Sequence, residues 1–66
     1  MIANTYETGK FYIGQSVMLG DIKALVVCVQ IRGGAESEPY RLYQCEWFQN
    51  GDIKSYWLEE YRLEAA

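Results

Sequence analysis

The side chains that could do chemistry in this sequence are two cysteines and a small set of carboxylates. Histidine, the commonest general base and a frequent zinc ligand, does not occur in the sequence. Cys28 and Cys45 have no base beside them and do not form a Cys-x-x-Cys pair. We expect both thiols to be reduced, with Cys45 packed inertly in the core. The cysteines therefore predict neither nucleophilic catalysis nor a zinc site.

The acidic residues follow no pattern that is typical of a metal site. They gather near the C-terminus and in one loop: Glu59, Glu60, Glu64, Glu36 and Glu38. Calcium takes roughly six to eight oxygen ligands, usually from Asp and Asn residues spaced around a glycine, and that spacing is missing. Gly33-Gly34 lacks the Lys-Ser/Thr pair that completes a phosphate-binding loop. We therefore expect no catalytic residue, no metal and no cofactor, and a chain that is not an enzyme.

The charge argues against nucleic acid as the main partner. The net charge is −3, and the six basic residues are scattered along the chain: Lys10, Lys23, Arg32, Arg41, Lys54 and Arg62. A nucleic-acid binder usually concentrates its positive charge, because that charge displaces the counterions of the phosphates. An acidic chain meets a basic protein surface more readily.

The 66 residues suffice for one domain, and aromatic residues make up 15% of them. A chain of this length buries only about 60% of its unfolded surface, so its core needs large side chains. We expect a flexible N-terminal arm over residues 1–10 and a single domain over residues 11–66. The arm has no apolar segment typical of a secretory signal, and the longest apolar run, residues 24–29, is too short to span a bilayer. We therefore expect a cytoplasmic protein without membrane contact.

The hydrophobic pattern predicts five short strands and no long helix. The strands are expected at residues 15–19, 22–32, 40–48, 52–58 and 62–64, with one helical turn at 59–61. In the second strand, alternation places four apolar residues on one face: Leu25, Val27, Val29 and Ile31. Residues 33–39 are expected to form a flexible acidic loop. Five antiparallel strands in so short a chain predict an all-β fold, a small five-stranded antiparallel SH3-like barrel.

The dipeptide Asn50-Gly51 predicts a type I′ hairpin turn, because both residues accept a positive φ. This turn would place Phe48 opposite Ile53 and assign the hairpin's side chains to two faces. One face carries Tyr43, Cys45, Trp47, Lys54, Tyr56 and Leu58, and we expect its aromatic rings to belong to the core. The other face carries Leu42, Phe48, Ile53 and Trp57. Exposed aromatic residues grouped on a sheet are typical of interfaces.

Several segments form a pattern that extends beyond the hairpin: Gly14-Gln15-Ser16-Val17-Met18-Leu19, a valine-rich second strand, Cys45-Glu46-Trp47-Phe48, and a final Trp57…Leu63. Over residues 11–64 the chain resembles the YodC-like small bacterial proteins, and similar chains with a tryptophan-rich hairpin occur in phages and prophages. It departs from them in its longer acidic loop and its N-terminal arm. The resemblance implies a barrel fold and no established activity.

Taken together, these patterns predict a non-enzymatic protein-interaction module, with a phage or prophage origin as one option. We expect it to bind a protein partner or a second copy of itself through Leu42, Phe48, Ile53 and Trp57, which we call the aromatic patch. The alternative is a nucleic-acid-binding small β-barrel that stacks bases on the same aromatic side chains. The acidic charge favours the first interpretation.

Overall fold

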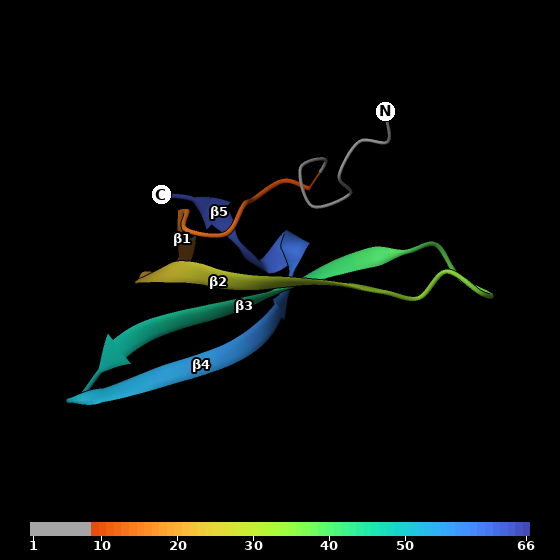
Figure 1. Ribbon diagram of the computed structural model, residues 1–66. Coiled ribbons are helices and arrows are strands. Elements are labelled where there is room, and N and C mark those ends of the chain that lie inside the picture. The colour runs from red at the N-terminus through yellow and green to blue at the C-terminus, as the bar shows by residue number, and fades with distance from the viewer. Residues whose placement is uncertain (1–8) are drawn as a thin grey trace.

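The computed structural model describes residues 9–66, which form one sheet of five antiparallel strands in the order β4-β3-β2-β1-β5 (Figure 1). The elements are β1 (Ser16–Leu19), β2 (Ile22–Arg32), β3 (Tyr40–Gln49), β4 (Asp52–Glu59), the 3-10 turn η1 (Glu60–Arg62) and β5 (Glu64–Ala65). The predicted all-β class and its five antiparallel strands are confirmed. The helical turn begins one residue later than the sequence predicts. Most of the predicted N-terminal arm, residues 1–8, lies outside the described residues.

The hairpin of β3 and β4 has the predicted register. Asn50 and Gly51 have φ values of 54° and 84°, as a type I′ turn requires. Phe48 lies opposite Ile53, and the pairing continues without interruption to Leu42 opposite Glu59. The turn and the strand alternation are both local, and this is why the sequence alone predicts the register.

The sheet is open, so its closure into the predicted SH3-like barrel is not confirmed. In the part of the chain that the structure describes, β4 and β5 are the two edges and do not pair with each other. β5 has only two residues and pairs solely with β1, opposite Val17 and Met18.

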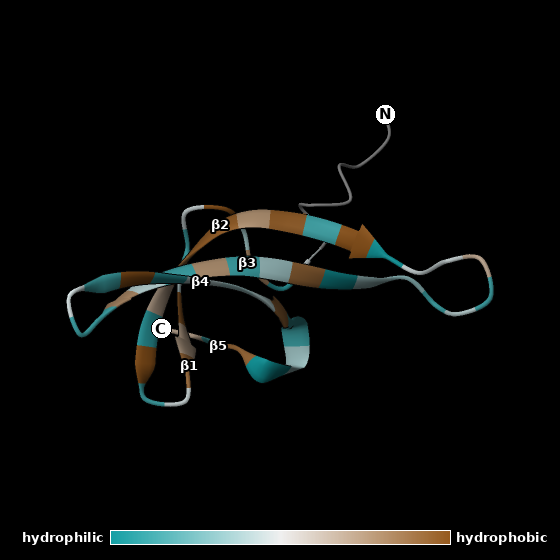
Figure 2. Cartoon of the chain, turned by 90° about the horizontal axis from the view of Figure 1, so that it is seen from below, coloured by the Kyte–Doolittle hydropathy of each residue, from teal (hydrophilic) through white to brown (hydrophobic). Residues whose placement is uncertain are grey.

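A β-bulge in β2 overturns the predicted alternation of that strand. Val26 lies opposite Cys45, but the next paired residue is Cys28, opposite Gln44, so Val27 is extra in the ladder. As a result, Leu25 and Val29 lie on opposite faces. Leu25 is 44% exposed, whereas Val29 is buried. A bulge also bends its strand, and Figure 2 shows β1 running across the direction of β3.

The core lies between the bent sheet and the segment before β1. Its buried members come from all parts of the described chain: Phe11, Val17, Ala24, Val26, Val29, Tyr43, Cys45, Leu58 and Leu63. Tyr43 and Cys45 are buried as predicted. The expectation of a core position for Tyr56 is wrong, because it is 54% exposed. Trp47 is half-buried and packs against the core, and the Tyr56 ring stacks on it at 5.5 Å.

Candidate functional site

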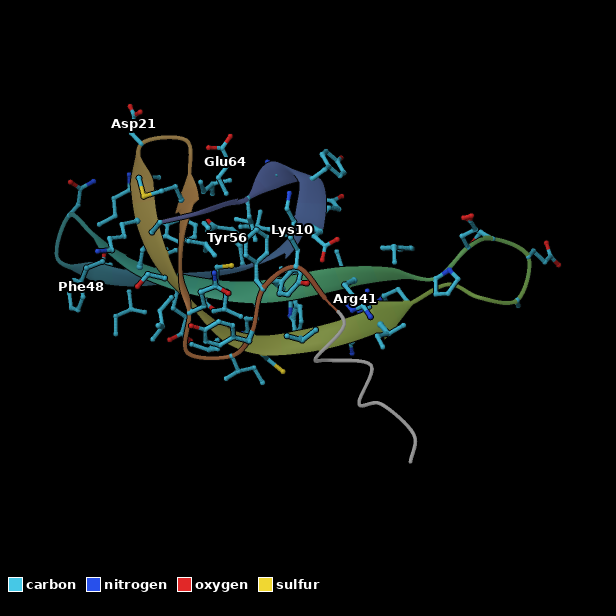
Figure 3. The ribbon with its side chains drawn as sticks, turned by 90° about the horizontal axis from the view of Figure 1, so that it is seen from above. Lys10, Asp21, Arg41, Phe48, Tyr56 and Glu64 are labelled. Carbon is cyan, nitrogen blue, oxygen red and sulfur yellow. The ribbon has the colours of Figure 1, made fainter. Side chains whose placement is uncertain are left out.

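The four residues of the aromatic patch lie on one face of the β3–β4 hairpin, as the register predicts. Phe48 and Ile53 are 73% and 63% exposed, and Trp57 is 40% exposed. Leu42 is only half-buried. Figure 3 shows Phe48 near the hairpin turn, at the opposite end of β3 from Arg41. The structure therefore brings these side chains to one surface and leaves their larger members in water.

A polar row divides this surface into two apolar groups. Phe48 and Ile53 face each other near the turn, and Trp57 lies opposite Gln44 two rows further along the hairpin. Between them lies the pair of Glu46 and Ser55. The Gln44 side-chain amide donates a hydrogen bond of 3.0 Å to the Ser55 hydroxyl, which holds this polar row in place. The patch is therefore two apolar groups with a polar bridge, and not one continuous surface.

The structure adds residues that the sequence analysis missed on this face. Leu25 lies on β2 opposite Glu46, at the end of the polar row, and its apolar side chain is 44% exposed. Cys28 lies opposite Gln44, beside the row that holds Trp57. Leu25 and Cys28 share this face only because of the bulge at Val27. No residue type in β2 predicts a bulge at that position.

A partly buried polar centre on the opposite face joins the N-terminal segment to η1. The Tyr43 hydroxyl donates a hydrogen bond of 2.5 Å to Glu60 Oε2, which also accepts one of 2.9 Å from the Lys10 backbone N–H. The Phe11 N–H reaches the Tyr43 hydroxyl at 3.4 Å. Gly9 packs so closely here that an added Cβ would lie 2.7 Å from the same hydroxyl. These contacts clamp the segment before β1 onto the sheet.

The surroundings of this centre keep the Tyr43 hydroxyl protonated and the Glu60 carboxyl ionised. Burial, with the hydrogen bond to Glu60, raises the pKa of Tyr43, so its hydroxyl keeps the proton that it donates. Burial acts to raise the pKa of Glu60 as well. The hydrogen bonds from Tyr43 and Lys10 and the charges of Arg41 and Lys10 outweigh it, and the pKa of Glu60 is lowered. The centre is therefore a carboxylate held by neutral donors and nearby cations.

An open depression of about 330 Å³ lies beside this centre. It is lined by Pro39, Tyr40, Arg41, Glu59, Glu60 and Tyr61. Tyr40 and Tyr61 are 50% and 81% exposed, and their rings form its apolar rim. The carboxylate of Glu60 within it is already engaged by Tyr43 and Lys10, so this side chain serves the fold.

We expect Glu60→Gln to remove an acid-sensitive part of the stability. Because folding lowers the pKa of Glu60, its ionised form stabilises the fold above its ordinary pKa, and this contribution is lost as the pH falls through the lowered value. At neutral pH the variant should lose about 1 kcal/mol. Denaturant unfolding at several pH values measures both proteins. The difference between them should shrink in acid, and a difference that stays constant would contradict this account.

Within residues 9–66, the structure brings together no group of three Cys, Asp or Glu side chains that could hold a metal ion. In the same part of the chain, no helix has the length and apolar character needed to cross a membrane. Both cysteines are free thiols, and burial raises the pKa of Cys45. Comparison with protein-family models, curated proteins and solved structures finds no significant match.

Proposed function

We propose that this chain is a non-enzymatic protein-interaction module of the SH3-like barrel type, which binds a protein partner or a second copy through the aromatic patch. The observation that carries the proposal is the exposure of Phe48 and Ile53, 73% and 63%, directly opposite each other on one sheet face. A cytoplasmic location, a phage or prophage origin and kinship with the YodC-like proteins remain predictions from the sequence.

The composition of the face supports a protein partner. Large aromatic and aliphatic side chains form hot spots in interfaces, and a polar rim surrounds them. Here Phe48, Ile53 and Trp57 supply the apolar contacts, while Glu46 and Gln44 lie on the same face between and beside them. Leaving two large rings in water brings no gain to a small domain, and a second surface would cover them.

The same aromatic side chains could stack on bases, which is the basis of the alternative function. Single-strand binders combine such rings with a positively charged groove. On this face the charged neighbours of the patch on β3 and β4 are Glu46 and Glu59, opposite Ser55 and Leu42. Negative side chains beside the rings repel phosphates, so the electrostatics favour a protein.

Trp57→Ala is expected to weaken association by about 2 kcal/mol or more, because a tryptophan at the centre of an interface commonly contributes this much. Its melting temperature should fall less than that of Tyr43→Ala, since the Trp57 indole is 40% exposed in the monomer and Tyr43 is fully buried. The unchanged chain and Trp57→Ala would each be immobilised, and the partner protein that each retains from a host lysate would be compared. The affinity of the purified partner for each is then measured by calorimetry.

Tyr12→Ala is the matched control, because Tyr12 is 62% exposed but precedes β1 and lies outside the hairpin. This variant should bind the partner as the unchanged protein does. Equal binding by Trp57→Ala would refute the proposed surface. Salt-dependent, sub-micromolar binding of a single-stranded oligonucleotide, lost in Trp57→Ala, would establish the alternative function instead.

A further inference from the structure

The outer edge of β4 carries backbone groups that no described strand uses. Gln49 and Asp52 flank the two-residue turn and form its hydrogen-bonded pair. Hydrogen-bonded and non-hydrogen-bonded pairs alternate along an antiparallel ladder. Every second residue of β4 therefore directs its N–H and C=O away from β3, toward the open edge: Ile53, Ser55, Trp57 and Glu59. Such an edge is a template for pairing with another strand.

We propose that two copies of this chain pair antiparallel along β4, with Ser55 on the twofold axis and Ile53 of each copy opposite the partner's Trp57. The result is one continuous sheet of ten strands. This inference rests on the proposed function, since it names the partner as a second copy and places the contact along the edge that borders the aromatic patch. The argument for a second copy is the self-complementarity of the β4 sequence.

Two conditions restrict the register of such a pair. Opposed residues must share a face, so a residue and not a peptide bond lies on the axis. Lys54 on the axis would place two ammonium groups directly opposite each other, which is unfavourable. Tyr56 on the axis would place Ile53 opposite the partner's Glu59, and Lys54 opposite the partner's buried Leu58. Ser55 on the axis places Ile53 opposite the partner's Trp57 and Lys54 opposite the partner's Tyr56, and the charged residue opposite the partner's Leu58 is then Asp52, at the end of the strand.

The register with Ser55 on the axis joins the apolar groups that the polar row separates within one chain. Phe48 lies beside Ile53 in each chain, and pairing adds the partner's Trp57 on the other side of Ile53. Each dimer would thus have two rows of three large apolar side chains across the junction. Cross-strand aromatic and β-branched pairs are among the most favourable in sheets. The exposure of Ile53 and Trp57 is explained by the place they take in the dimer.

The opposite face also fits this register. Lys54 lies opposite Trp47 within the chain, and pairing places the partner's Tyr56 on its other side. Tyr56 is 54% exposed, so its ring is accessible to an ammonium group. On the face of the aromatic patch, Glu46 of the two copies would be three strand spacings apart, about 14 Å. This distance exceeds the screening length of about 8 Å at physiological salt, so their repulsion is weak.

Proline at Ser55 tests the edge without disturbing the hairpin. The Ser55 N–H points away from β3, so Ser55→Pro keeps every β3–β4 bond but removes both hydrogen bonds at the axis. We expect sedimentation equilibrium to show a dimer for the unchanged protein, and for Ser55→Pro a dissociation constant raised about 30-fold or more. Ser55→Ala is the matched control. It loses the same hydroxyl bond to Gln44 as proline does but keeps the N–H, and it should remain a dimer. Circular dichroism confirms that each variant is folded.

Cross-linking tests the register. Opposed residues in a hydrogen-bonded pair have Cα atoms about 5.5 Å apart, within the range that a disulfide spans. Ser55→Cys should form a reducible dimer on mild oxidation, and peptide mapping should find the bond between the two introduced cysteines. Tyr56→Cys should not form a bond with its own copy. Cross-linking of Tyr56→Cys in preference to Ser55→Cys would overturn the register.

The outcomes separate this inference from the proposed function. A chain that stays monomeric up to millimolar concentration overturns the dimer, while the patch can still bind another protein. A dimer that survives Ser55→Pro but is lost in Trp57→Ala overturns edge pairing and supports face-to-face contact through the patch. A dimer that is unaffected by both variants forms through another surface and contradicts the inference, and the retention of a host protein by Trp57→Ala then decides the proposed surface separately.

Discussion

Tyr43→Ala should unfold the domain, at a cost of about 3–5 kcal/mol in the free energy of unfolding. Tyr43 is fully buried, its ring meets that of Phe11 edge to face at 5.4 Å, and its hydroxyl holds Glu60. The substitution removes the ring and leaves the partly buried carboxylate of Glu60 without its closest donor. A chain of 66 residues has a total stability of roughly 3–10 kcal/mol, so this single loss is large.

Tyr43→Phe separates the two contributions, because it keeps the ring and removes only the hydroxyl. We expect it to lose about 1–3 kcal/mol, the range for leaving a buried polar group unsatisfied. Urea unfolding followed by tryptophan fluorescence measures both variants. In the Glu60→Gln background the loss should be smaller, since the charged acceptor is then absent. Equal losses in both backgrounds would show that the hydroxyl and the carboxylate act independently.

Leu63→Ala should be similarly damaging, with a loss of about 2–5 kcal/mol. Leu63 is 1% exposed and lies between η1 and the short strand β5, and its N–H donates to Glu60 C=O. β5 pairs through only two residues, so the burial of Leu63 is the main attachment of the C-terminal segment to the core. We expect this variant to lose protection from hydrogen exchange first in β1 and β5.

Ile53→Ala is the control for Leu63→Ala, because it truncates a side chain that is 63% exposed. Measured at a concentration where the chain is monomeric, its stability should change by less than about 1 kcal/mol. If Ile53→Ala is as destabilising as Leu63→Ala, then the hairpin face is covered within the monomer, and the aromatic patch is part of the fold.

The β3–β4 hairpin shows what local sequence information determines. Asn50-Gly51 imposes positive φ at adjacent positions, and this turn fixes which residues oppose each other. Side-chain alternation then assigns Phe48, Ile53 and Trp57 to one face and Tyr43 and Cys45 to the other. No contact beyond the hairpin is needed for this, so the register of the hairpin and the common face of these side chains could be predicted from the sequence.

In β2, by contrast, tertiary packing overrides alternation. Val27 bulges out of the ladder, and the core takes Val26 and Val29 instead of a single row of alternate residues. A bulge is favoured by the bend it produces, which brings β1 and the segment before it over the core. That benefit depends on partners distant in the sequence, so the valine-rich pattern of β2 contains no sign of it.

Two further features depend on residues that are distant in the sequence: whether the sheet closes, and how the polar centre forms. The sequence predicts five strands, their antiparallel hairpins and a net negative charge. Whether β4 and β5 meet depends on the length of β5 and the curvature of the sheet, and here they remain separate edges. From the sequence, Glu60 is interpreted as a surface carboxylate. In the fold it accepts hydrogen bonds from Lys10 and Tyr43, which lie 50 and 17 positions away in the sequence. Desolvation and hydrogen bonding arise only when these segments pack together, and a linear pattern does not contain them.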